Sequence, residues 1–420
     1  MTEKLNDGFE AEKEDKQTKI RWDIIYRGTL IQIIMALCTV RWEPGRLFLS
    51  SIGNKVEQLL SYSYIGAAFV YSDNLIYNQT VFAFQCLSVI YFVNFLVEVM
   101  FYYQILQRLF LNLGSFLQKA IGTTPIESIN CCVSVFLGMN EAMLVIKLYV
   151  KDLTLSELQA VFLGQLSTVA GSVFAAYVSF GVKPGYLVSA SVMSAPGALT
   201  LSKLLYPETE VSKTKSDSLK IDTSHREKFS SALSAGCHGA LSAVNIVSGV
   251  VASLITFISL VAFANGIVSF FADLIGFENV TLITLLAKCF IPVAFLIGIE
   301  PSQCHIVSEL IATKAIVNEF MAYQKLGDFK KQNLLSKKSE AIATYALCSF
   351  SNPSSVASVI AMVSALCPEQ LEVTTKLAFR AYIGGIVTCF ISASLAGMLM
   401  PTNNTVDIMD MIPATNTSHI

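Results

Sequence analysis

Apolar residues in this chain gather into runs long enough to cross a lipid bilayer, separated by shorter polar segments. A transmembrane helix needs about 20 predominantly apolar residues. Residues 48–70 and 267–277 instead mix apolar and polar residues at helical spacing, which is typical of helices that lie along a membrane surface. We therefore predict an all-α membrane protein, a polytopic helical bundle. The expected crossings are residues 24–40, 81–102, 157–181, 184–206, 231–263, 339–366 and 373–400.

One apolar segment, residues 123–150, is interrupted by polar residues. It breaks at Gly138 and then presents Asn140 and Glu141. A carboxylate at bilayer depth costs about 3 kcal/mol on insertion scales, so acids in such places usually mark function. Irregular backbone at this depth is tolerated only inside the protein or beside a cavity. We predict a re-entrant hairpin here.

A second interrupted segment spans residues 282–323 and breaks at residues 298–301, which contain Glu300. We predict a second re-entrant hairpin at this place. Two crossings are interrupted as well, at residues 193–197 and at residues 352–353. Each hairpin is followed by two such helices, and the intervening crossings make the hairpins enter from opposite faces. This is the pattern of an inverted repeat in secondary transporters, whose broken helices form a midplane site.

The repeat divides the chain into six parts. Its two halves are joined by scaffold helices, and polar tails flank the whole. The predicted parts are a cytoplasmic tail at 1–21, scaffold helices and an interfacial helix at 22–118, the first transport repeat at 119–206, a cytoplasmic loop with a long scaffold helix and an interfacial helix at 207–281, the second transport repeat at 282–400 and an extracellular tail at 401–420.

Composition narrows the class further. Charged residues make up 14% of the 420 residues, against about 25% in soluble domains. The net charge of −2 gives no indication of nucleic-acid binding. The ten cysteines lie mostly singly in apolar segments without a C-x-x-C motif, so we expect them to pack rather than bind metal. No nucleophile–base pair is evident, so we expect neither an enzyme nor a cofactor.

The interrupted segments supply candidate ligands for a solute. Glu141 and Glu300 can accept hydrogen bonds from hydroxyls or amides, balance Na⁺ or carry a proton. Asn352 adds an amide, and Phe350 offers an aromatic face. Such a set suits a neutral polyhydroxylated or heteroaromatic solute, because an anion would favour Arg or Lys.

Other interpretations of these residues stay open. Glu300 could be an interfacial acid, because Pro301 and polar residues follow it directly. Asn352-Pro353 could be a helix kink alone, and Phe350 could be a packing residue. The role of residues 318–323 is left open.

Several motifs occur in the order known from one transporter family. Gly138-Met-Asn-Glu141-Ala142 stands where that family has Gly-Gln-Thr-Glu followed by Ala or Ser. From about Arg27 to Met400 the chain resembles the concentrative nucleoside transporter family. The other matching motifs are residues 124–128, 168–181, 191–210, 298–300, 318–323 and 341–352.

The resemblance implies a homotrimer in the plasma membrane that takes up nucleosides with a coupling cation, by an elevator-like motion. It implies that the nucleobase faces one group of residues and the ribose hydroxyls another. The base group is Met139, Asn140, Glu141 and Val173, with Phe350 nearby, and the ribose group is Glu300, Asn352 and Ser355. The implied Na⁺ site uses Ser134, Leu137, Thr168 and Val169, partly through carbonyl oxygens.

The chain departs from the family pattern at three of these positions. Met139 and Asn140 replace the family's Gln and Thr, and Ser134 replaces an Asn. Base selectivity and the coupling ion, which could be Na⁺, H⁺ or both, therefore stay open. The departures also motivate an alternative function, a nucleoside-binding receptor or regulator that no longer transports.

Overall fold

The computed structural model describes residues 20–214, 229–277, 280–368 and 371–400, apart from the side chains of Asn140, Leu144, Ser172 and Ala175. Over these residues the secondary structure is helical and no strand is described, which confirms the predicted fold class. Four helices are long and apolar enough to cross a membrane, by length and composition: Trp22–Arg41, Phe82–Tyr102, Ala232–Leu274 and Leu371–Leu399. The tail predicted at 401–420, and that at 1–21 except for residues 20 and 21, lie outside the described residues.

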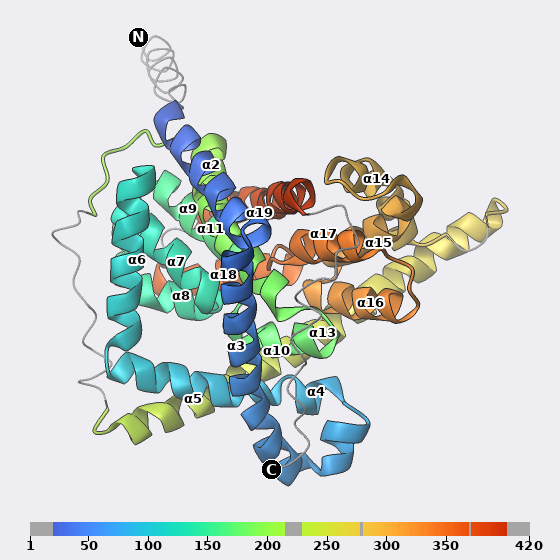
Figure 1. The fold of residues 1–420 in the computed structure, drawn as a ribbon, viewed down its shortest axis with the longest axis horizontal. Helices are drawn as coiled ribbons and strands as arrows, with labels where there is room; N and C mark the ends of the chain where they lie inside the picture. The colour runs from blue at the N-terminus through green and yellow to red at the C-terminus, as the bar shows by residue number, and fades with distance from the viewer. Residues whose placement is uncertain (1–19, 215–228, 278–279, 369–370, 401–420) are drawn as a thin grey trace.

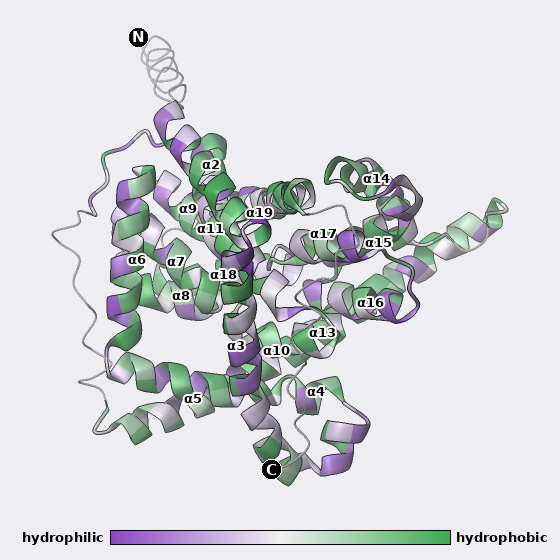
Figure 2. Cartoon of the chain, in the orientation of Figure 1, coloured by the Kyte–Doolittle hydropathy of each residue, from purple (hydrophilic) through white to green (hydrophobic). Residues whose placement is uncertain are grey.

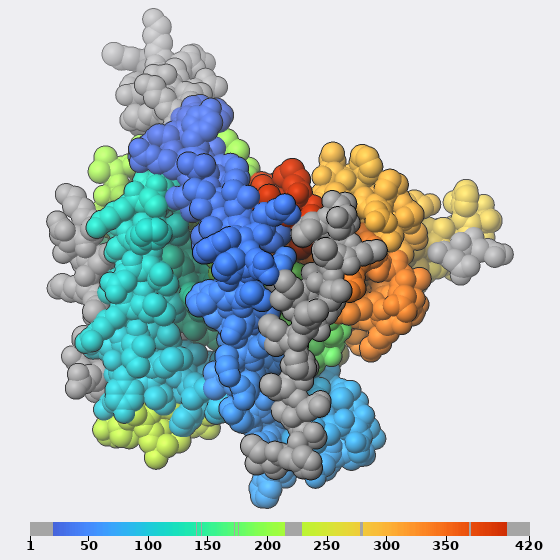
Figure 3. All heavy atoms as spheres, viewed as in Figure 1, coloured from blue at the N-terminus to red at the C-terminus, as the bar shows by residue number. Residues whose placement is uncertain are grey.

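In the view of Figure 3 the amino-terminal helices occupy the left and the centre of the molecule, and later helices lie on the right. Among the amino-terminal helices, α2 and α3 contact α11 of the first repeat, whereas α5 packs mainly on the long helix α13. The surface helix predicted at 48–70 is part of the longer α3. The bounds are α2 Trp22–Ala36, η1 Leu37–Arg41, α3 Glu43–Tyr71, η2 Asn74–Asn78, α4 Phe82–Gln85, α5 Ser88–Tyr102 and α6 Ile105–Ile121.

The same order of elements occurs twice in the remainder of the chain. A pair of helices with a two-residue break is followed by a helix with an unwound middle and then by a long helix. The first set is α7 Pro125–Phe136, α8 Met139–Ile146, α9 Leu155–Leu166, α10 Phe174–Ser179 and α11 Pro184–Leu205, with short turns η3 Val150–Asp152 and η4 Gly171–Val173. The second set is α15 Cys304–Ile316, α16 Glu319–Lys331, α17 Lys337–Leu347, α18 Pro353–Leu366 and α19 Leu371–Leu399.

Contacts between the two sets are reciprocal. Helix α8 of the first set contacts α18 of the second, α16 contacts α10, and α11 contacts α19. The helix pairs α7/α8 and α15/α16 lie on opposite sides of α11 and α18 (Figure 1). Each pair therefore packs on the broken helix of the other repeat.

The helices between the two repeats present an apolar surface. Helices α13 (Ala232–Leu274) and α14 (Leu282–Leu296) are apolar on their outward faces (Figure 2). Most of α13 is exposed, and only 6% of its most apolar window is buried. A helix that is apolar all round and exposed is typical of a lipid environment.

The separate surface helix predicted at residues 267–277 is wrong, because α13 continues to Leu274. The crossing predicted at residues 231–263 instead continues through Gly266. A glycine inside a helix costs only about 1 kcal/mol relative to alanine, which does not end an apolar helix. Asn265 instead accepts a hydrogen bond from the backbone N–H of Leu282 at 3.0 Å and so helps to fix the start of α14.

The interruption predicted at residues 193–197 is also wrong. Helix α11 runs through Pro196, and the unwound segment of this repeat lies between α9 and α10. Pro removes one helical hydrogen bond, but nearly every residue of α11 is buried between other helices. Close packing on all sides holds the helix together across the proline.

The break predicted at residues 298–301 exists but separates α14 from α15. Gly298 has φ +97°, a conformation that favours glycine. In element order, the pair that corresponds to α7/α8 is α15/α16, whose break lies at Val317 and Asn318. Both breaks end apolar helices, so hydrophobic pattern alone could not distinguish them.

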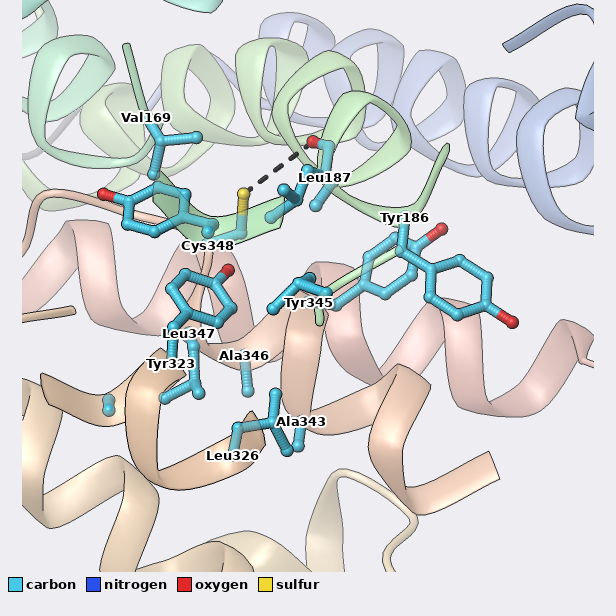
Figure 4. Packing of buried hydrophobic residues seen from close by; sticks show 14 of the residues in the cluster. Val169, Tyr186, Leu187, Tyr323, Leu326, Ala343, Tyr345, Ala346, Leu347 and Cys348 are labelled. Atoms are coloured by element: carbon cyan, nitrogen blue, oxygen red, sulfur yellow. Dashed lines mark hydrogen bonds between the residues drawn. The ribbon is translucent and has the colours of Figure 1, made fainter. Parts of the chain in front are cut away.

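One buried cluster joins the two repeats. Tyr177 and Leu187 of the first repeat pack in it with Tyr323, Tyr345 and Cys348 of the second. Figure 4 shows Leu187, Tyr323, Tyr345 and Cys348 around the end of α17, where the Cys348 thiol donates to the Leu187 carbonyl oxygen at 3.8 Å. The core therefore lies where the two broken helices cross.

Candidate functional site

Two unwound segments meet at the centre of the molecule. One follows α9 and the other separates α17 from α18. The backbone N–H of Phe350 donates to the Thr168 carbonyl oxygen at 3.0 Å, and the Ser351 hydroxyl donates to the Leu166 carbonyl oxygen at 2.8 Å. Unwound backbone exposes carbonyl and N–H groups that helices would otherwise pair. These are the groups that a bound solute or ion can use.

The tip of α7/α8 brings an acid close to this centre. Glu141 lies in the first turn of α8 and is half-buried. A Cβ on Gly138 would come within 2.4 Å of the Glu141 carboxylate, so the glycine leaves room for it. Met139 is half-buried between two core clusters, and Val173 is buried. The Asn140 side chain lies outside the described part of the structure.

The tip of α15/α16 holds a second acid, Glu319, which is only 2% exposed. Its carboxylate accepts a hydrogen bond from the Asn352 amide at 2.6 Å and one from the Tyr177 hydroxyl at 3.4 Å. Asn318 caps α16 by accepting from the backbone N–H of Met321 at 3.0 Å. Three elements distant in sequence therefore converge on Glu319.

The remaining candidates of the second repeat divide into two groups. Asn352 caps α18 by accepting from the Ser355 N–H at 2.9 Å, and both residues are buried, as is Phe350. Glu300 is exposed in the turn before α15. Among the described residues, no side-chain hydrogen bond connects Glu300 to another candidate. The structure therefore brings Asn352, Ser355 and Phe350 together, and it places Glu319 rather than Glu300 beside them.

The four residues expected to hold a cation lie at the carboxyl ends of α7 and α9. All four are buried. The Thr168 hydroxyl donates to the Ser134 carbonyl oxygen at 2.8 Å, and the Ser134 hydroxyl donates to the Asn130 carbonyl oxygen at 2.8 Å. Leu137 and Val169 lie just beyond the helices. Hydroxyl lone pairs, freed carbonyls and the negative ends of two helices suit a small hard cation.

Sequence reasoning missed Glu319, Tyr177 and Lys314 as members of the site. The motif at 318–323 was noticed but given no role. A detectable signal was present, because Lys314 and Glu319 are charged residues inside an apolar stretch. Tyr177 lies within the matching motif at 168–181, but the sequence gave it no role, since its role depends on a contact with a residue far along the chain.

Comparison with known proteins agrees with this architecture. Residues 186–397 match the family model described as "Na+ dependent nucleoside transporter C-terminus", and residues 15–74 match that of the N-terminus. Residues 83–183 match a model described as "Nucleoside recognition". The chain belongs to the Na⁺-dependent nucleoside transporter family.

The relatives of this family member include curated and solved proteins. It is 34% identical over 394 residues to sodium/nucleoside cotransporter 2 of Rattus norvegicus, and the match covers 90% of this chain and 59% of the relative. Its identity to solute carrier family 28 member 3 of Eptatretus stoutii is 34%, covering 91% of this chain and 57% of that one. This chain thus spans less than two thirds of the length of these relatives.

Solved structures of the transporter CNTnw are similar to this chain. A variant in an outward-facing state superposes with a TM-score of 0.85 at 32% identity, covering 91% of this chain and 94% of that one. CNTnw in an inward-facing substrate-bound state gives a TM-score of 0.84 at 32% identity, covering 91% and 93%. The family consists of membrane transporters and not of enzymes, so the chain is a multi-pass membrane protein.

Proposed function

We propose that this protein is a Na⁺-coupled symporter that concentrates nucleosides into the cell across the plasma membrane. Its family supports the activity, and the names of its relatives support both the solute and the ion. The main observation behind the proposal is the hydrogen bond from the Asn352 amide to the buried Glu319 carboxylate, beside the two unwound segments. This arrangement offers a polar, oxygen-rich site inside an otherwise apolar bundle.

The ribose would bind at Glu319, Asn352 and Ser355. An ionised carboxylate has about four lone-pair positions, and two of those on Glu319 are used by Asn352 and Tyr177. The others can accept hydroxyl protons of a sugar. The sequence assigned this role to Glu300, but a buried acid discriminates better than an exposed one, because water does not compete for it.

The nucleobase would bind at the α7/α8 tip. Glu141 can accept a hydrogen bond from a base N–H, and Met139, Val173 and Phe350 can pack on the ring. Asn140, at the position of the family's Thr, would add an amide. A methionine sulfur is a weak acceptor, so we expect shape and Glu141 rather than Met139 to select the base.

Coupling would use Na⁺ bound by Ser134, Leu137, Thr168 and Val169. One charge moving down 100 mV supplies about 2.3 kcal/mol. At about 1.4 kcal/mol for each tenfold, this supports a nucleoside gradient of several tens-fold. Proton coupling through Glu141 or another acid of the site is the second possibility for the ion.

Alternating access would follow an elevator-like motion in a homotrimer. The reciprocal contacts between the repeats support their movement as one unit, because each helix pair packs on the broken helix of the other. The exposed apolar surface of α13 supports a lipid or subunit contact. Mass photometry of the protein in nanodiscs tests the trimer.

Uptake into proteoliposomes tests the symporter. We expect radiolabelled uridine or adenosine to accumulate above its outside concentration under an inward Na⁺ gradient. A pH gradient without Na⁺ tests H⁺ as the coupling ion. Equilibration without accumulation under either gradient would contradict symport, and binding without any flux would favour the receptor alternative.

A further inference from the structure

Lys314 is a buried ammonium in the last turn of α15, on the other side of the break from Glu319. Its side chain is 1% exposed, and it donates a hydrogen bond to the Ala346 carbonyl oxygen at 3.0 Å. Burying an ammonium is costly unless opposite charge surrounds it. The surroundings of Lys314 must therefore compensate its charge.

Two helix ends supply part of this compensation. Lys314 lies in the last turn of α15, and Ala346 lies in the last turn of α17. The last carbonyls of a helix have no partner within the helix, and together they carry about half a negative charge. The ammonium therefore lies where the negative ends of two helices converge.

Glu319 is a second buried charge, of opposite sign, across the break. It begins α16, directly after the break that follows α15, and its side chain is 2% exposed. An acid and an ammonium that are buried on the two sides of a two-residue break can compensate each other. The same carboxylate accepts from Asn352 and Tyr177. The Asn352 amide and the Tyr177 hydroxyl are neutral donors, whereas Lys314 carries a full positive charge.

The first repeat has a neutral residue at the corresponding place. Ser134 lies two residues before the end of α7 at Phe136, as Lys314 lies two residues before the end of α15 at Ile316. Ser134 also meets the end of the broken helix of its repeat, through Thr168. The first repeat offers oxygen atoms where the second carries an ammonium.

We propose that Lys314 is a tethered counter-cation for Glu319 and that it directs this carboxylate toward the hydroxyl groups of the solute. Lys314 is a positioning residue, because it acts through Glu319 and not on the solute. The proposal rests on the proposed function, which assigns Glu319 to the sugar. A bound ion would leave the protein during the transport cycle. A lysine is part of the chain, so it keeps a positive charge in the second repeat in every state.

A ratio of affinities tests the proposal. Affinities for uridine and for 2′,3′-dideoxyuridine are measured on purified protein by competition with radiolabelled uridine. The wild type is expected to prefer uridine by roughly tenfold to a hundredfold, as for loss of hydrogen bonds to a charged group. Lys314→Met is expected to lose most of this preference by weakening uridine binding alone.

Lys203→Met is the matched control, because Lys203 is also buried and ion-paired, with Glu127. It can lower the amount of folded protein, but we expect it to leave the affinity ratio unchanged. A Lys314→Met protein that keeps the wild-type ratio would overturn the proposal. A wild type without any preference would instead overturn the assignment of Glu319 to the sugar, and with it this role of Lys314.

Thermal unfolding covers the case in which Lys314→Met does not fold. If the two charges compensate each other, the double variant Lys314→Met/Glu319→Gln is more stable than Lys314→Met alone, because no unpaired charge is buried. A double variant that is no more stable, or that also fails to fold, would show that Lys314 does not act as the counter-charge of Glu319.

Discussion

The two repeats share one order of helices but bury charge at opposite ends of them. In the first repeat, Lys203 contacts Glu127 near the amino end of α7, and it donates to Ser156 near the start of α9 at 2.8 Å. In the second, Lys314 lies at the carboxyl ends of α15 and α17. Amino ends of helices favour acids, and carboxyl ends favour cations.

The difference between the repeats separates structural charge from functional charge. Glu127 and Glu157 cap the starts of α7 and α9, and the latter accepts from Ser212 at 2.6 Å. This cluster is distant along the helices from the unwound segments and ties the repeat to the chain after α11. Lys314 and Glu319 lie beside the break and the crossing. Lys203 and its partners therefore stabilise the fold, whereas Glu319 lies where the proposed solute would bind and Lys314 lies across the break from it.

The largest effect is expected at the structural pair. Lys203→Met leaves the Glu127 carboxylate buried without its ammonium, which typically costs about 3–5 kcal/mol. We expect a large fall in the unfolding temperature, measured by fluorescence-detected thermal unfolding in detergent. Adding Glu127→Gln should recover part of the loss, and a single variant as stable as the wild type would contradict a structural role for the pair.

The next largest effect distinguishes two acids of the second repeat. Glu319→Gln removes a charged acceptor of hydroxyl groups, and such a hydrogen bond contributes about 1.5–3 kcal/mol. We expect kcat/KM for uridine uptake to fall by roughly tenfold to a hundredfold. Glu300→Gln, at an exposed carboxylate, is the control and should stay near wild type. The reverse result would restore the sequence-based assignment of Glu300.

A smaller effect is expected at the tip of the first repeat. In Gly138→Ala the new methyl group meets the Glu141 carboxylate at 2.4 Å, and this flexible side chain must move. We expect about a tenfold loss of uptake, equivalent to about 1.4 kcal/mol, with unchanged thermal stability. Gly249→Ala on α13, where a Cβ meets nothing within 4 Å, is the control. Equal uptake by both variants would argue against a role for the position of Glu141.

The smallest effect is expected at the cap of α16. Asn318→Ala removes the acceptor for the Met321 N–H, and loss of such a cap costs about 1 kcal/mol. We expect a small fall in unfolding temperature and a modest rise in the KM for uridine, because the cap fixes the start of the helix that carries Glu319. Asn318→Ser retains a neutral side-chain oxygen as acceptor and should behave nearly as the wild type in the same unfolding and uptake measurements.

Local pattern predicted the features that depend on neighbours in sequence. The break at Gly138 with Glu141 behind it, and the break at Asn352-Pro353, both appear in the structure where the sequence indicated them. Turn residues, caps and prolines act over a few positions, so they can be recognised without a fold. The same local signals overpredicted a break at residues 193–197. The separate surface helix predicted at 267–277 is likewise part of a continuous helix, because packing or an apolar surrounding keeps both helices intact.

The sequence by itself determined an all-α membrane protein of this transporter family, because apolar run length and short motifs are properties of adjacent residues. Only the tertiary structure decided that Glu319 and not Glu300 is buried with Asn352, and that Lys314 lies at the meeting of two helix ends. Burial and charge pairing depend on which distant segments share one volume. The sequence pattern around a carboxylate in an apolar run is the same whether the carboxylate faces water or is buried beside an amide.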